Sequence, residues 1–221
     1  MKKAVRLPGP THRLTIVGRT GSGKTQAAAW HLSNANFDEQ PWVILNFKGD
    51  ALIDAIEGTR EIGYNEIPDH PGIYILRPLP GEEELLGDYF VRARMRENVG
   101  FWVDEGYMTK GVEGFDGLLT QGRSKHIPMI ILSQRPVWLS RFVFSEADFY
   151  QIFHLNSERD RKIIEDFVPD GVTSRLKEYH SLYYDVGKDK LTKFKPVPPA
   201  AQILSRINER LEAMAPRRRY I

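Results

Sequence analysis

The residues at positions 18–25 form the clearest chemical pattern in the chain. They read Gly-Arg-Thr-Gly-Ser-Gly-Lys-Thr and fit G-x-x-x-x-G-K-[ST], a loop that wraps phosphate. We expect its three glycines to take positive φ angles and to let backbone N–H groups approach an anion. Lys24 adds a mobile charge for the β- and γ-phosphates, and the Thr25 hydroxyl is a hard oxygen ligand suited to Mg²⁺. The pattern therefore predicts a nucleotide site.

A strand before this loop and a helix after it would hold the loop in place. Arg13–Val17 is a short apolar segment, and residues 26–32 favour a helix. This order brings the positive end of the helix dipole to the phosphates. We expect the nucleotide to be bound by Gly18, Arg19, Thr20, Gly21, Ser22, Gly23, Lys24, Thr25 and Gln26.

Two adjacent carboxylates follow a second apolar segment, residues 99–103. A strand there would present Asp104 and Glu105 at its carboxyl end, where open α/β sheets bind ligands. This is the Walker B arrangement, in which Asp104 completes the Mg²⁺ coordination shell and Glu105 polarises the attacking water. The alternative is that both carboxylates are merely solvated at a strand end.

A third polar group follows the apolar segment 127–132, which also predicts a buried strand. Gln134 comes just after it, and in a parallel sheet its amide would lie at the same edge as the phosphate loop and the two carboxylates. A glutamine there can hydrogen-bond the γ-phosphate or the attacking water.

Composition indicates one α/β domain with a sizeable core. The chain has 221 residues, a net charge of +2 and no cysteine, which excludes disulfides and thiolate metal sites. No apolar run approaches the length needed to span a bilayer, so we expect a soluble protein without an intrinsic membrane segment. The predicted division is an arm at 1–10, an ATPase domain at 11–195, and a Pro-rich spacer with an amphipathic helix and a basic tail at 196–221.

The remaining pattern predicts a mostly parallel sheet flanked by helices. Further strands are expected at 41–47, 73–77 and 149–154, and helices at 51–57, 82–98, 115–124 and 157–167, the last with Ser157 as N-cap. Four glycines between positions 106 and 117 indicate a mobile connection. A β-hairpin is expected over 181–195, and a helix over 200–214 with an apolar stripe at Ile203, Ile207, Leu211 and Met214.

In the order found here, these motifs resemble those of the FtsK/HerA superfamily of DNA-translocating ATPases. The segment Asn46-Phe47-Lys48-Gly49-Asp50 is similar to the ending of that family's second strand, with Asn46 in place of the usual aspartate. Arg123 precedes Gln134 by eleven residues, the family's spacing for an arginine that reaches a neighbouring subunit. Residues 150–161 also fit a family segment, so the resemblance covers roughly residues 11 to 186.

The resemblance implies a RecA-like core that assembles into a ring, expected to be a hexamer, with ATP and Mg²⁺ between neighbours. Arg123 would act in trans on the transition state, and Gln134 would report the γ-phosphate to residues facing double-stranded DNA. The short length is similar to that of genome-packaging ATPases of internal-membrane icosahedral viruses, including tectivirus-like phages. That implies action in the host cytoplasm, and at the virion vertex beside a portal or vertex membrane protein.

Two other classes of protein stay open. One is a phage assembly or secretion ATPase, although such proteins usually carry a transmembrane segment. The other is a small-molecule P-loop kinase, which would need an acceptor site and has little use for a water-activating Glu105. For Arg123 alone, the alternative is a cation that caps the carbonyls at a helix end.

Overall fold

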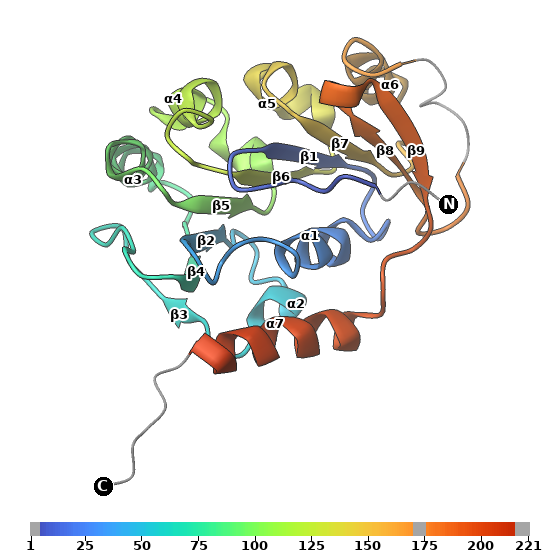
Figure 1. Ribbon diagram of the computed structural model, residues 1–221. Helices are drawn as coiled ribbons and strands as arrows, with labels where there is room; N and C mark the ends of the chain where they lie inside the picture. The colour runs from blue at the N-terminus through green and yellow to red at the C-terminus, as the bar shows by residue number, and fades with distance from the viewer. Residues whose placement is uncertain (1–4, 170–175, 215–221) are drawn as a thin grey trace, which may run out of the picture.

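One central sheet organises the protein (Figure 1). A computed structural model describes residues 5–169 and 176–214, and within them nine strands pair in the order β3-β4-β2-β5-β6-β1-β7-β8-β9. The strands are β1 (Arg13–Val17), β2 (Pro41–Leu45), β3 (Arg60–Glu61), β4 (Gly72–Leu76), β5 (Gly100–Val103), β6 (Met129–Ser133), β7 (Phe149–Ile152), β8 (Ser181–Asp185) and β9 (Lys190–Phe194). The pairs from β3 to β7 are parallel, and the β8–β9 hairpin is antiparallel.

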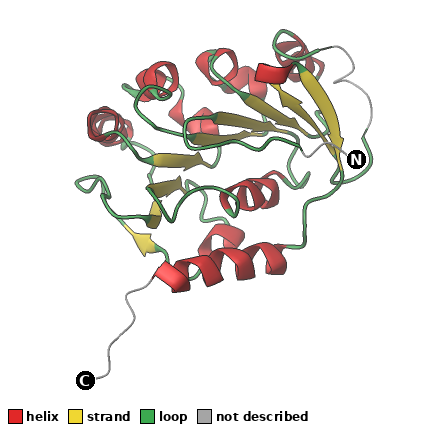
Figure 2. Ribbon diagram, in the orientation of Figure 1, coloured by secondary structure: helices red, strands yellow, loops and turns green. Residues whose placement is uncertain are grey.

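Helices cover both faces of the sheet (Figures 1 and 2). They are α1 (Lys24–Leu32), α2 (Ala51–Asp54), α3 (Glu83–Arg96), α4 (Phe115–Gln121), α5 (Phe142–Ser145), α6 (Glu158–Glu165) and α7 (Ala200–Met214). The layer formed by α3, α4, α5 and α6 packs over one hydrophobic cluster, and α1, α2 and α7 pack over the other. The predicted α/β class with a mostly parallel sheet is confirmed. None of the described helices is both long and apolar enough to cross a membrane.

The central strands are buried on both faces, which explains their nearly continuous apolar sequences. In β1, Leu14 and Ile16 belong to one hydrophobic cluster and Val17 to the other. The Thr15 hydroxyl between them is buried and donates a hydrogen bond to the Val143 carbonyl at 2.8 Å. The predicted strands and the hairpin are confirmed within a few residues, but β3 was not predicted because its two residues are exposed and polar.

The glycine-rich segment 106–117 differs from the predicted mobile connection. Residues 106–109 form a 3₁₀ helix, and Gly117 lies inside α4. A Cβ on Gly106 would lie 2.6 Å from Ile131 Cγ2, so this glycine permits close packing against β6. The prediction was wrong there because composition alone does not separate a glycine needed for space from one that loosens a loop. Ser157 does precede α6, but its side chain makes no capping hydrogen bond.

Helix α7 packs through the predicted stripe, in which Ile203, Ile207 and Leu211 are buried. We expect Ile207→Ala to lower the free energy of unfolding by about 2–5 kcal/mol, because it leaves a cavity beneath the helix. Urea unfolding measures this change, with the exposed Arg206→Ala in the same turn as control. A change at Ile207 no larger than that of the control would mean that α7 does not pack on the core in solution. The basic tail at 216–221 lies outside the described residues.

Candidate nucleotide site

The loop between β1 and α1 is fixed to the strands on either side of β1. The Gly18 N–H donates to the Ser133 carbonyl at 3.2 Å, and the Arg19 N–H donates to the His154 carbonyl at 2.9 Å. Gly23 is the N-cap of α1 and provides no side chain to cap it. The first N–H groups of α1 therefore have no acceptor within the helix and are available to an anion.

The three glycines of this loop serve two different needs. Gly21 and Gly23 have φ angles of +74° and +97°, as predicted from the motif. Gly18 does not have a positive φ, so the prediction was wrong at that position. A Cβ there would lie 2.5 Å from the Phe153 Cβ, and the loop could not then pass so close to the end of β7.

The predicted residues from three strand ends converge at the carboxyl edge of the sheet. Val17 of β1 pairs with Ser133 of β6, and β5 pairs with β6 in parallel, so the segments that follow these strands leave the sheet on the same side. A cavity of about 470 Å³ lies there, and its lining includes Lys24, Thr25, Asp104 and Glu105. Gln134 is linked to the loop by a hydrogen bond that its Oε1 accepts from the Thr20 hydroxyl.

Lys24 bonds to its own loop in this structure. Its Nζ donates to the Arg19 carbonyl at 3.0 Å. Burial lowers the pKa of Lys24, and the nearby carboxylates of Glu105 and Asp104 oppose that shift. A bound phosphate would supply the closer negative charge that a partly desolvated ammonium group favours.

Asp104 is buried, with 5% of the residue exposed. Burial raises its pKa to about 7, and the neighbouring charges of Glu105 and Asp50 add to the shift. A divalent cation would reverse this penalty. Asp104 and Thr25 line the same cavity and offer two oxygen ligands, which fits Mg²⁺ that takes its other ligands from phosphates and water. The described residues contain no cluster of three acidic or histidine side chains that would hold a metal by itself.

The raised pKa of Asp104 predicts how stability depends on pH. The ordinary value is 3.8 and the folded value is about 7, so the folded state holds this proton more tightly than the unfolded state. Its contribution to stability is present below pH 4 and is lost as pH rises through about 7. In urea unfolding without nucleotide or Mg²⁺, we expect the wild type to lose stability relative to Asp104→Asn between pH 5 and 8. Parallel pH curves for the two proteins would contradict this.

Glu105 adopts a left-handed backbone conformation, with φ of 59°, directly after Asp104. Its Oε1 forms an ion pair with Lys48, and its buried Oε2 has no hydrogen-bond partner among the described residues. Lys48 and Asp50 also line the cavity, as does Tyr179. None of these three was predicted as a site residue. Lys48 and Asp50 lie in the segment 46–50, whose resemblance to the superfamily pattern could have indicated them. Tyr179 lies in no recognisable sequence pattern.

Asn46, which departs from the superfamily pattern, shapes the turn that carries Lys48 and Asp50. Its Oδ1 accepts a hydrogen bond from the Asp50 N–H at 2.9 Å, and its Nδ2 donates to Asp54 at 3.0 Å. An amide can make both contacts because it is donor and acceptor at once, whereas an aspartate could accept only.

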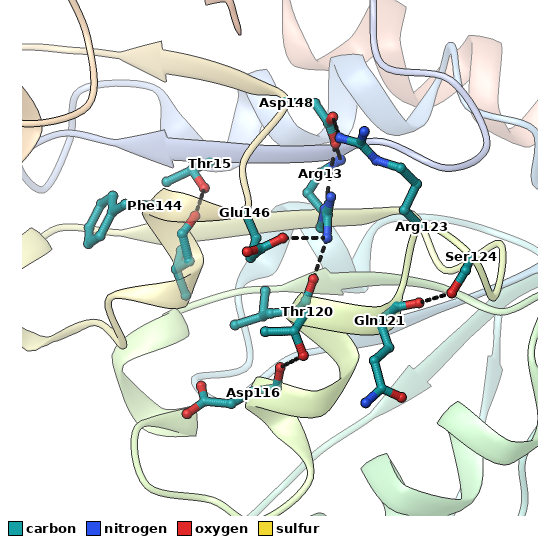
Figure 3. A network of polar contacts seen from close by, with 12 residues as sticks. Arg13, Thr15, Asp116, Thr120, Gln121, Arg123, Ser124, Phe144, Glu146 and Asp148 are labelled. Atoms are coloured by element: carbon teal, nitrogen blue, oxygen red, sulfur yellow. Dashed lines mark hydrogen bonds and ion pairs between the residues drawn. The ribbon is translucent and has the colours of Figure 1, made fainter. Parts of the chain in front are cut away.

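Arg123 is not brought to this cavity. It follows α4, and its guanidinium forms an ion pair with Asp148, just before β7 (Figure 3). Asp148 also accepts a hydrogen bond from the N–H of Arg13, the first residue of β1. The phosphate loop follows the other end of β1, roughly 17 Å away for five residues at about 3.3 Å each. Among the described residues, the guanidinium donates to the Asp148 carboxylate and not to carbonyls at a helix end, so the alternative in which Arg123 caps a helix does not hold either.

The chain is similar to known proteins in sequence and in fold. No protein-family model matches it. It is 45% identical over 220 residues to the DNA packaging ATPase P9 of Enterobacteria phage PRD1, with 92% of this chain and 95% of that protein covered.

Two solved structures share the fold at low sequence identity. The genome packaging NTPase B204 of Sulfolobus turreted icosahedral virus 2, in complex with AMPPCP, aligns with a TM-score of 0.64 and 18% identity, covering 86% of this chain and all of B204. The cytoplasmic domain of the type VII secretion ATPase EccC of Thermomonospora curvata aligns with a TM-score of 0.59 and 17% identity, covering 92% of this chain and 28% of that one. At these identities the likeness concerns the fold.

Proposed function

The chain belongs to the family of the phage PRD1 DNA packaging ATPase P9, and from that membership we propose that it hydrolyses ATP to move double-stranded viral DNA into a preformed capsid. The observation that carries this proposal is 45% identity over nearly the whole of both proteins. The cavity at the carboxyl edge of the sheet supports it, because residues of the glycine-rich loop, Lys24 and two carboxylates line one space.

In this proposal, the loop binds and orients the ATP phosphates. The free N–H groups at the start of α1 and the Lys24 ammonium hold the β- and γ-phosphates. Thr25 and Asp104 would hold Mg²⁺, which would neutralise phosphate charge. Glu105 accepts the proton of the attacking water and so must exchange its ion pair with Lys48 for a hydrogen bond to that water. The bond between Thr20 and Gln134 links the phosphate loop to the segment after β6.

Assembly would complete the site. The Arg123 side chain is 64% exposed. Through Asp148 it lies near Arg13, at the start of β1, whereas its own phosphate loop follows the other end of that strand. This position favours action on a neighbouring subunit. We propose a ring of six subunits in which each Arg123 stabilises the transition state of ATP hydrolysis in the neighbouring subunit. The ring would move DNA through contacts to the phosphate backbone without reading sequence, in the host cell and at the virion vertex, beside a portal or vertex membrane protein.

The first test is ATP hydrolysis at several protein concentrations, with and without double-stranded DNA. Because the site needs two subunits, we expect the rate per subunit to rise with concentration and DNA to increase it. A rate per subunit that is independent of concentration and of DNA would contradict the proposal. Phosphate transfer to a small acceptor under those conditions would instead indicate a kinase.

A further inference from the structure

The guanidinium of Arg123 depends on one side chain for its orientation. Arg123 lies in a turn after α4, where an arginine has many rotamers available. Its Nη2 donates to Asp148 Oδ1, and no other hydrogen bond to this side chain occurs within residues 5–169 and 176–214 (Figure 3). The remaining N–H groups of the guanidinium are therefore available to another acceptor.

Asp148 is itself held firmly. Its side chain is only 9% exposed, and its backbone N–H donates to the Arg13 carbonyl at 2.9 Å. Its Oδ2 accepts from the Arg13 N–H at 2.8 Å, while Oδ1 serves Arg123. One carboxylate oxygen therefore binds the start of β1, and the other binds the exposed arginine.

Buried groups fix this carboxylate from the other side. The Arg13 side chain is 4% exposed, and its Nη1 donates to the Leu119 carbonyl and lies 3.5 Å from Glu146 Oε2. Its Nε lies 3.5 Å from Asp148 Oδ2. The network in Figure 3 joins β1, α4 and the segment before β7, so Asp148 is a rigid support for a side chain that would otherwise be mobile.

We infer that Asp148 is a positioning residue for ATP hydrolysis in the neighbouring subunit, because it fixes the Arg123 guanidinium in the orientation that meets the neighbour's phosphates. The inference rests on the proposed trans action of Arg123. An arginine that is already oriented loses less conformational freedom when it binds the transition state, and small displacements of such a group are costly to the rate.

Mixed rings test this inference. Subunits with Arg123→Ala keep their nucleotide site but lack the arginine, whereas subunits with Lys24→Ala lack a working site but can donate Arg123. Each protein alone should be inactive, and mixing them should restore DNA-stimulated hydrolysis. When the Lys24→Ala donor also carries Asp148→Asn, we expect the restored rate to fall about tenfold to a hundredfold. The donor's own site is already disabled, so this fall cannot come from damage to its phosphate loop through β1.

Two further arms separate positioning from folding. Glu146→Gln in the donor removes a carboxylate that contacts Arg13 but leaves both Asp148 oxygens and their hydrogen bonds in place, so the restored rate should fall much less than with Asp148→Asn. Asp148→Asn in the Arg123→Ala acceptor should lower the rate much less than the same change in the donor. Unfolding curves and ring mass are measured for every variant.

The outcomes distinguish the inference from the proposed function. Full restoration by the Asp148→Asn donor, or an equal loss in both arms, would overturn the role of Asp148 while leaving Arg123 as the trans arginine. If Arg123→Ala alone kept its DNA-stimulated hydrolysis, the trans action would be refuted, and the inference with it.

Discussion

Glu105→Gln is expected to abolish ATP hydrolysis and to leave ATP binding nearly unchanged. The amide has almost the same shape as the carboxylate, but it cannot accept a proton from the attacking water. General-base catalysis of this kind contributes about a hundredfold to ten-thousandfold to the rate. The loop N–H groups and Lys24 still hold the phosphates, so affinity for ATP should change little. Single-turnover hydrolysis and equilibrium binding of ATP measure the two effects separately.

The matched control is Glu113→Gln, which makes the same change at an exposed position outside the cavity. That variant should hydrolyse ATP at the wild-type rate. If Glu105→Gln kept more than about a tenth of the wild-type rate, Glu105 would not be the group that activates water, and the carboxylate pair would require another explanation.

Arg123→Ala is expected to lower hydrolysis about a thousandfold or more in the assembled protein, the effect typical of an arginine supplied in trans. The loss should appear only where subunits meet, because Arg123 lies far from its own phosphate loop. The rate is best measured at a protein concentration at which light scattering shows that the ring has formed.

Arg96→Ala is the control, because Arg96 is an exposed arginine near the end of α3. It should change the rate by less than a factor of two or so. Near-wild-type, DNA-stimulated hydrolysis by assembled Arg123→Ala would leave Arg123 with a structural contact to Asp148 and no part in the chemistry.

Much of the fold could be predicted because its central strands are buried on both faces. A strand such as β2, with the sequence Pro-Trp-Val-Ile-Leu, must then be apolar along its whole length, and that pattern is visible in one sequence. The convergence of Asp104, Glu105 and Gln134 on the phosphate loop followed from the same fact, since parallel strands end at one edge. The edge strand β3 has no such constraint, and its two exposed residues gave no signal.

The contacts within the site were less predictable because they depend on three-dimensional distances. Lys48 pairs with Glu105, which is far from it in sequence, and outside the cavity Arg123 pairs with Asp148. No sequence motif relates the two members of either pair. The raised pKa of Asp104 could not be predicted from the sequence either, because its main cause is burial of the side chain in the folded protein. The spatial need for Gly18 depends on Phe153, which belongs to the segment after β7.

Movement along DNA is the central claim, and displacement of a third strand tests it most directly. A short oligonucleotide bound as a triplex to a long duplex is released when a motor moves along that duplex. We predict that the assembled protein releases the oligonucleotide with ATP and Mg²⁺, and that it does not do so with a non-hydrolysable ATP analogue or with Glu105→Gln. DNA-stimulated ATP hydrolysis without release of the third strand would contradict the account.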